Sequence, residues 1–181
     1  MTQFRYFTNA ADTRTRGVDV VGTYAIPFAT SGLDLTASYS YGKTEVTRLD
    51  ASPAVLTGLG ITTGLVGRDE IGRLEDSFPK SKAIVGGTWH SDHWSVGLTG
   101  TRYGSVTVRN STTPANDQTF DAKWLVDVNA SYKPTSQWTL TVGADNVLDT
   151  YPQENTYANS TSGVFPYSNY SPFGFNGAYV Y

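Results

Sequence analysis

The sequence contains no cysteine, and this absence excludes two kinds of site. Without thiols the chain can form neither a disulfide scaffold nor a thiolate metal centre. Charged residues are also scarce, at 16% of the chain, against about a quarter in ordinary soluble domains. The formal net charge is −3, which argues against nucleic acid as a partner because nucleic-acid-binding surfaces are basic.

Long apolar runs are missing as well. No stretch approaches the roughly 18 apolar residues that a transmembrane helix needs, and helical periodicity is nearly absent throughout. The N-terminal residues MTQFR lead into polar residues and do not form the basic and apolar segments of a signal peptide. If the protein is exported, we expect this sequence to be a mature piece or a fragment.

The pattern that is present has a period of two, which is typical of β-strands. Each complete run is long enough to cross the apolar band of a membrane as a tilted strand of about 10 residues. At Arg102 and Tyr103 the alternation inverts, which predicts a bulge or the edge of the membrane there. The alternating runs cover residues 16–26, 33–47, 82–90, 94–108, 123–133 and 138–148, and a seventh begins at Phe173.

The connections alternate in length. Short turns are expected at residues 28–32, 91–93 and 134–137, and long polar loops at 49–80, 109–122 and 150–171. Structureless loops of this length are uncommon in compact soluble domains. Short periplasmic turns at one end and long extracellular loops at the other are typical of outer-membrane β-barrels.

Aromatic residues flank each short turn, where amphipathic rings would mark the boundary between hydrocarbon and headgroups. These residues are Tyr24, Phe28, Trp89, Trp94, Tyr132 and Trp138. The sequence therefore predicts an all-β fold, namely part of an antiparallel transmembrane β-barrel with about seven meandering strands that do not close. The alternative is a soluble β-sandwich with a tyrosine-rich surface.

Several stretches resemble the C-terminal barrel strands of TonB-dependent outer-membrane receptors. The most specific is WLVDVNASYKPTSQWTLTVGADNVLDTYP, which resembles the penultimate hairpin of that family and ends in a form of its NLFD-x-Y-P signature. The others, in the order found in the family, are TRGVDVVGTYAI, LDLTASYSYGKTEVT, LEDSFPKSKAIVGGTW, TRYG and PYSNYSPFGFNGAYVY. The resemblance covers nearly the whole chain.

This resemblance implies that residues 1–181 are the C-terminal segment of a receptor barrel, without the plug domain and the N-terminal strands of a barrel of about 22 strands. The whole protein would lie in a Gram-negative outer membrane and take up a large, scarce nutrient, such as an iron–siderophore complex, a cobalamin or an oligosaccharide. Uptake would be energised through TonB, contacted by the missing N-terminal region.

The implied partners are outer-membrane lipid, the plug, the remaining strands, TonB and the nutrient. The resemblance implies no enzymatic activity and no cofactor. A passive outer-membrane porin and a soluble β-sandwich binding module remain as alternatives. A barrel enzyme is a further rival, and it would depend on His90 or His93.

Two sets of residues are candidates for function. Aromatic side chains of the last loop could stack on substrate, or could pack against one another or form the outer girdle; these are Tyr157, Phe165, Tyr167 and Tyr170. Carboxylates that alternate with apolar neighbours should face the barrel lumen, where they would contact the plug or substrate, or simply hydrate the wall. They are Asp19, Asp34, Asp127 and Asp145.

No catalytic or metal-binding residue is predicted. The stretch HSDH at residues 90–93 could hold Zn²⁺, but it reads better as a polar turn between two tryptophans. The acidic groups at 68–70 and 75–76 lack the spacing of a calcium loop. Asp145 and Asn146 are expected at a strand end, where short polar side chains terminate the ladder by bonding to local backbone groups.

Overall fold

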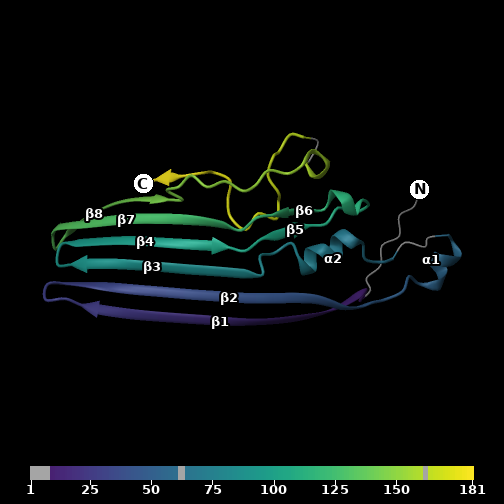
Figure 1. Cartoon of the computed structure of the whole chain (residues 1–181), viewed down its shortest axis with the longest axis horizontal. Coiled ribbons are helices and arrows are strands. Elements are labelled where there is room, and N and C mark those ends of the chain that lie inside the picture. Colours follow the sequence, from purple (N-terminus) through teal and green to yellow (C-terminus); the bar gives the residue numbers. More distant parts are fainter. Residues whose placement is uncertain (1–8, 61–63, 161–162) are drawn as a thin grey trace.

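A computed structural model describes residues 9–60, 64–160 and 163–181, and the structural statements below refer to them. Seven strands form one antiparallel sheet, in the order β1-β2-β3-β4-β7-β8-β9, and the two end strands do not meet (Figure 1). The predicted open, seven-stranded antiparallel sheet is therefore confirmed. Its strands are β1 (Ala11–Pro27), β2 (Ser31–Leu49), β3 (Ser81–Ser91), β4 (Trp94–Tyr103), β7 (Lys123–Thr135), β8 (Trp138–Asp145) and β9 (Tyr179–Val180).

The register of the sheet gives it one apolar and one polar face. Leu35 pairs with Gly87, which in turn pairs with Leu98, and Leu98 pairs with Val128. Because side chains alternate between faces along each strand, these positions share one side of the sheet. We call this side the apolar face; it also carries Val18, Val20, Tyr24, Tyr39, Tyr41, Trp89, Val96, Trp124, Val126, Tyr132, Leu140 and Val142.

The opposite side, here the polar face, carries mainly small and hydrophilic residues. In one row across the sheet, Asp34 pairs with Thr88 and Thr88 with Gly97. The same row continues from Gly97 to Asn129 and Gly143, and in the next row on this face Thr99 pairs with Asp127. The predicted alternation thus holds on every long strand, and neighbouring strands keep it in phase.

Nothing in the described chain covers the apolar face. Val20 is 59% exposed, Leu98 54% and Val142 58%. The buried hydrophobic residues of the described chain are Val106, Phe120 and Ala144. A β-sandwich buries its apolar faces against each other, so this single layer does not fit the sandwich alternative.

The connections divide by length between the two ends of the sheet. Short turns join β1 to β2, β3 to β4 and β7 to β8 at one end, and the long connections gather at the other (Figure 1). No helix in the described part of the chain is long and apolar enough to cross a membrane. The long connections contain α1 (Ala54–Gly58), α2 (Arg68–Glu75), β5 (Val106–Val108), β6 (Gln118–Phe120), η1 (Pro114–Asn116) and η2 (Tyr157–Asn159).

Two details of the sequence prediction are wrong, and one of the two alternatives predicted at Arg102 is excluded. The run 94–108 is broken, because β4 ends at Tyr103 and β5 pairs with β6 in a separate two-stranded sheet. At Arg102 the register of β4 does not shift on either side, so there is no bulge, and the edge of the membrane stays a prediction there. The last strand begins at Tyr179 and not at Phe173, whose ring instead packs against Tyr103 with 5.7 Å between ring centroids.

Gly104 lies where the chain leaves β4. Its backbone N–H donates to the carbonyl of Ser81, 2.8 Å away, as the chain leaves the sheet. A Cβ at this position would lie 2.7 Å from the Ser81 hydroxyl and 3.0 Å from its carbonyl oxygen. Only glycine allows the two backbones to approach this closely.

Candidate functional site

The three long connections pack together into one structure, which we call the loop layer. It comprises the described parts of residues 50–80, 104–122 and 146–178. The layer folds toward the polar face, since Phe173 contacts Tyr103, and Tyr103 pairs with the polar-face residues Lys82 and Lys123. It is therefore placed where a ligand would meet the polar side of the sheet.

An ion pair joins the first connection to the second. The guanidinium of Arg68 donates to both carboxylate oxygens of Asp117, each at 2.7 Å, and also to the carbonyl of Asn110. Asp117 accepts a further bond from the Asn110 backbone N–H at 2.9 Å. Hydrogen bonding to Arg68 is the main reason that the pKa of Asp117 falls to about 2. A two-pronged pair of this kind fixes the relative position of both segments.

A second set of charges lies at the C-terminal end of α2. Arg109 donates to Glu75 at 3.0 Å and to Asp76, and Lys80 donates to Asp76 at 2.8 Å. Partial burial opposes ionisation of Asp76, but the bonds from Lys80 and Arg109 outweigh it and lower the pKa of this carboxyl. Glu75 also accepts the backbone N–H of Val46 at 2.9 Å, which ties the layer to β2.

Amide side chains join the second connection to the third. Buried Gln118 donates to the carbonyl of Glu154 and accepts the N–H of Thr156, both at 2.8 Å. Asn159 donates to the carbonyl of Asn116 at 2.7 Å. The carboxamide of Gln118 thus uses both of its ends, as a buried polar group must if burial is not to destabilise the fold.

The third connection begins at a turn built by Asn146. This buried residue follows the end of β8 and has a left-handed backbone, with φ of 51°. Its N–H donates to the Asp127 carboxylate at 2.7 Å, and its side chain bonds both the carbonyl and the N–H of Thr150, at 2.9 and 3.0 Å. The predicted role of Asn146 as a strand terminator is confirmed.

Asp149 then joins the two ends of the third connection. It also has a left-handed backbone, with φ of 52°, and its carboxylate accepts the N–H of Ala178 at 2.9 Å. The charge of Asp149 is the main cause of a raised pKa at Tyr151. The DNVLDTY stretch therefore positions the whole last loop above the sheet.

Four aromatic rings form a cluster in the last loop: Tyr151, Phe165, Tyr167 and Phe175. Tyr167 is at its centre, with ring centroids 6.2 Å from Tyr151, 5.9 Å from Phe165 and 6.0 Å from Phe175. Phe165 and Phe175 meet edge to face at 4.9 Å. The rings pack on one another, yet Tyr151, Phe165 and Phe175 are each still partly exposed.

Only two of the four predicted binding residues, Phe165 and Tyr167, belong to this cluster. Tyr157 lies outside it and is 87% exposed. Tyr170 lies elsewhere, at a small cavity. Phe175 was missed, because the alternation around it was read as the start of a strand.

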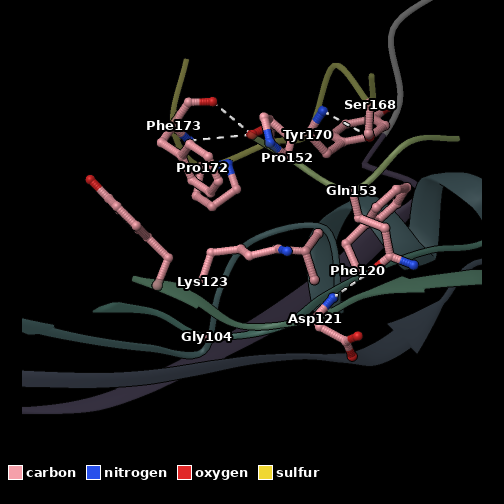
Figure 2. A pocket seen from close by; sticks show the side chains of 13 residues that line it. Gly104, Phe120, Asp121, Lys123, Pro152, Gln153, Ser168, Tyr170, Pro172 and Phe173 are labelled. Atoms are coloured by element: carbon pink, nitrogen blue, oxygen red, sulfur yellow. Dashed lines mark hydrogen bonds between the residues drawn. The ribbon is translucent and has the colours of Figure 1, made fainter. Parts of the chain in front are cut away.

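The cavity at Tyr170 lies between the last loop and the loop end of β4 and β7. Figure 2 shows Lys123 and Asp121 below it and Pro172, Phe173 and Tyr170 above. It has a volume of about 20 Å³, which is enough for roughly one water molecule. A bond from the Asp121 N–H to the Gln153 side chain, 3.2 Å long, closes one side. This cavity is therefore too small to admit a large ligand.

The four predicted carboxylates all occupy polar-face positions, but the sheet does not bring them together. Asp19 pairs with Ser40, Asp34 with Thr88, Asp127 with Thr99 and Asp145 with Tyr179. Asp127 has a structural task, since it accepts the N–H of Asn146. Their contact with a plug or substrate stays a prediction.

The two histidines of the HSDH turn have different partners. His90 Nε2 lies 3.3 Å from the Asp34 carboxylate, whereas His93 Nδ1 lies 3.0 Å from the Lys133 carbonyl oxygen. Within the described ranges, no three histidine, aspartate or glutamate side chains are grouped so that they could hold a metal ion.

Comparison with known families gave one match. The family described as "TonB dependent receptor-like, beta-barrel" matches residues 2–147. The matched region contains β1 to β8 and two of the three long connections. No curated protein matched the chain.

Proposed function

Because the chain belongs to the TonB-dependent receptor β-barrel family, a family of outer-membrane transport receptors, we propose that it is part of a receptor for a large, scarce nutrient. The observation that supports this best is the exposed apolar face, which continues across six strands, together with a loop layer that lies at only one end of the sheet. Family membership also favours a receptor over a passive porin.

The apolar face would meet the hydrocarbon of the outer membrane. On β2 its positions run from Leu33 to Tyr41, which matches the about 9–11 residues that a tilted strand needs to cross. Trp89, Trp94 and Tyr132 would lie at the periplasmic interface, and Tyr39 and Trp124 at the outer one. The loop layer would then be extracellular.

The polar face would form part of the lumen wall. Open sheet edges cannot remain unpaired in lipid, so β1 needs a neighbouring strand from elsewhere in the receptor. We take residues 1–181 as the C-terminal segment of such a barrel. A plug domain in the lumen and TonB as the source of energy complete the proposal, as the family implies.

Nutrient binding would use the loop layer. The ring cluster of Tyr151, Phe165, Tyr167 and Phe175 offers partly exposed aromatic surface, and exposed Tyr157 lies in the same connection. Rigid rings make good anchors because they bury a large area at a small cost in conformational entropy. An iron–siderophore complex, a cobalamin and an oligosaccharide all have surfaces that such rings could contact.

Thiol labelling of intact cells tests this arrangement. Ser111 in the loop layer and Ser136 in the β7–β8 turn are both exposed, so a cysteine at either site is sterically available. In the intact receptor, Ser111→Cys should react with a membrane-impermeant maleimide on whole cells, and Ser136→Cys should react only after the outer membrane is opened. The reverse pattern would overturn the proposed orientation, and equal labelling at both sites would overturn the membrane location.

A further inference from the structure

The two longest strands continue past the apolar band, and their outer ends change chemistry on the same face. On the apolar face, Val18 pairs with Tyr41. Two residues further along each strand Arg16 pairs with Lys43, and then Arg14 pairs with Glu45. The register between β1 and β2 shifts only beyond this point, between Asp12 and Thr13. The charged residues therefore lie on the side of the sheet that carries Val18 and Tyr41.

A surface hollow lies at this change from apolar to charged. It has a volume of about 380 Å³, and its lining includes Arg16, Val18, Tyr41, Lys43 and Glu45. One wall is thus apolar and the other is charged. Lys43 contacts Glu45 at 2.6 Å, and both side chains stay about half exposed.

Positive charge is in excess at the hollow. We call Arg14, Arg16 and Lys43 the basic patch. Glu45 lies among its three cations and both arginines interact with it electrostatically; Lys43 also interacts with Glu75, which is itself paired with Arg109. Arg102 is a further cation on the apolar face. It lies at the loop end of β4, where it pairs with Ala83 of β3 and Trp124 of β7. These cations can bind a further anion.

The other end of the apolar face differs. Near the short turns, its described positions carry Trp89, Trp94, Tyr132 and Trp138, and no lysine or arginine. Cations at one interface and neutral rings at the other would match a membrane in which the leaflet on the loop side carries the denser negative charge.

We propose that the hollow binds the phosphate group of an outer-leaflet lipid, whose acyl chains lie along the apolar face below. Arg16 and Lys43 donate to the phosphate oxygens, and Val18 and Tyr41 contact the first methylene groups. The lipid thereby fixes the outer ends of β1 and β2 at the membrane surface. This inference rests on the membrane orientation of the proposed function, but not on the identity of the nutrient.

The test uses the intact receptor in neutral detergent, titrated with phosphatidic acid, with diacylglycerol of the same acyl chains, and with inorganic phosphate. Native mass spectrometry counts the bound lipid. Removing two interfacial cations by Arg16→Gln/Lys43→Gln should weaken phosphatidic acid binding by about thirtyfold. Glu45→Gln should strengthen it by about fivefold, an outcome that misfolding cannot imitate.

A charge-matched control is Arg48→Gln/Lys82→Gln. Arg48 is already paired with Asp12 at 2.9 Å and Asp50 at 3.6 Å, and Lys82 lies on the polar face over the Tyr103 ring. This variant should bind phosphatidic acid as the parent does. Equal loss in the two double variants, or equal binding of phosphatidic acid and diacylglycerol, would overturn the proposal.

Inorganic phosphate that binds as tightly as phosphatidic acid would assign the site to a free anion and overturn the lipid. If no variant changes binding because a carboxylate of a neighbouring strand neutralises the basic patch, the proposal is likewise wrong. Thiol labelling at residues 111 and 136 decides the orientation separately. A failure of the proposed function is therefore distinguishable from a failure of this site.

Discussion

The sheet and the loop layer are built on opposite principles. The sheet is held by backbone ladders and exposes its apolar side chains, so most of its hydrophobic surface contacts no other part of the described chain. The loop layer buries Val106 and Phe120 and joins its segments through ion pairs and amides such as Arg68–Asp117 and Gln118. Stability of the sheet should thus depend on the surrounding medium, and that of the loop layer on individual polar contacts.

The largest expected effect concerns the two faces of the sheet. Val128 lies on the apolar face and Asn129, its neighbour, on the polar face. Arginine at a lipid-facing position near the membrane centre costs about 2–4 kcal/mol. Val128→Arg should therefore reduce the heat-modifiable, folded receptor in the outer membrane far more than Asn129→Arg. Equal damage from the two would erase the distinction between the faces.

The next effect concerns the turn where sheet and loop layer meet. Asn146→Ala removes two side-chain bonds to Thr150 and puts alanine at a positive φ, which together should destabilise the turn by about 1–3 kcal/mol. Asn146→Gly is the matched control, because it loses the same bonds but tolerates the backbone. Proteolysis of the last loop should rise in the order parent, Gly, Ala. A Gly variant as labile as Ala would show that only the bonds matter.

A smaller effect is expected for nutrient binding. Tyr167→Ala removes the central ring of the cluster, and loss of such an anchor typically costs about 1–2 kcal/mol, or roughly tenfold in dissociation constant. Weaker binding at an unchanged melting temperature would support contact with the nutrient. Tyr170→Ala, at the separate cavity, should alter binding less. Loss of stability without loss of binding would leave the cluster with a purely structural role.

The smallest effect is a response to acid. Asp117 has a pKa of about 2 in the folded protein, below the unfolded value of about 3.9. Because the folded pKa is lower, the stabilisation from Asp117 is complete above pH 4 and is lost as the pH falls toward 2. Pepsin cleavage of residues 104–122 should rise between pH 4 and pH 2 in the parent and be high throughout in Asp117→Asn. If cleavage of residues 104–122 in the parent already rose at pH 5, this result would contradict the Arg68–Asp117 contact.

Sequence reasoning succeeded where the cause is local. A period of two predicted the alternating strands that carry Leu35 and Val128, and Asn146 marked its strand end because its partner, Thr150, is four residues away. Chain geometry of this kind is visible in any short window. The same reasoning failed at Phe175, where contacts with Phe165 and Tyr167 override the alternation.

The contacts that build the loop layer could not be predicted in this way. Arg68 and Asp117 are 49 residues apart, and nothing near either one marks the other as its partner. The close approach of Ser81 to Gly104 could not be predicted either, because it depends on the position of the adjacent strand. Long-range pairing in loops depends on the completed sheet beneath them.

The most direct measurement compares two adjacent positions in lipid. Val128→Cys and Asn129→Cys, each labelled with the small fluorophore bimane, would be placed in the intact receptor and reconstituted with lipids brominated along their acyl chains. Since Val128 lies on the apolar face and Asn129 on the polar face, bromine should quench the label at residue 128 strongly and leave that at 129 nearly unaffected. Equal quenching at both positions, or stronger quenching at 129, would contradict a sheet that meets lipid through its apolar face.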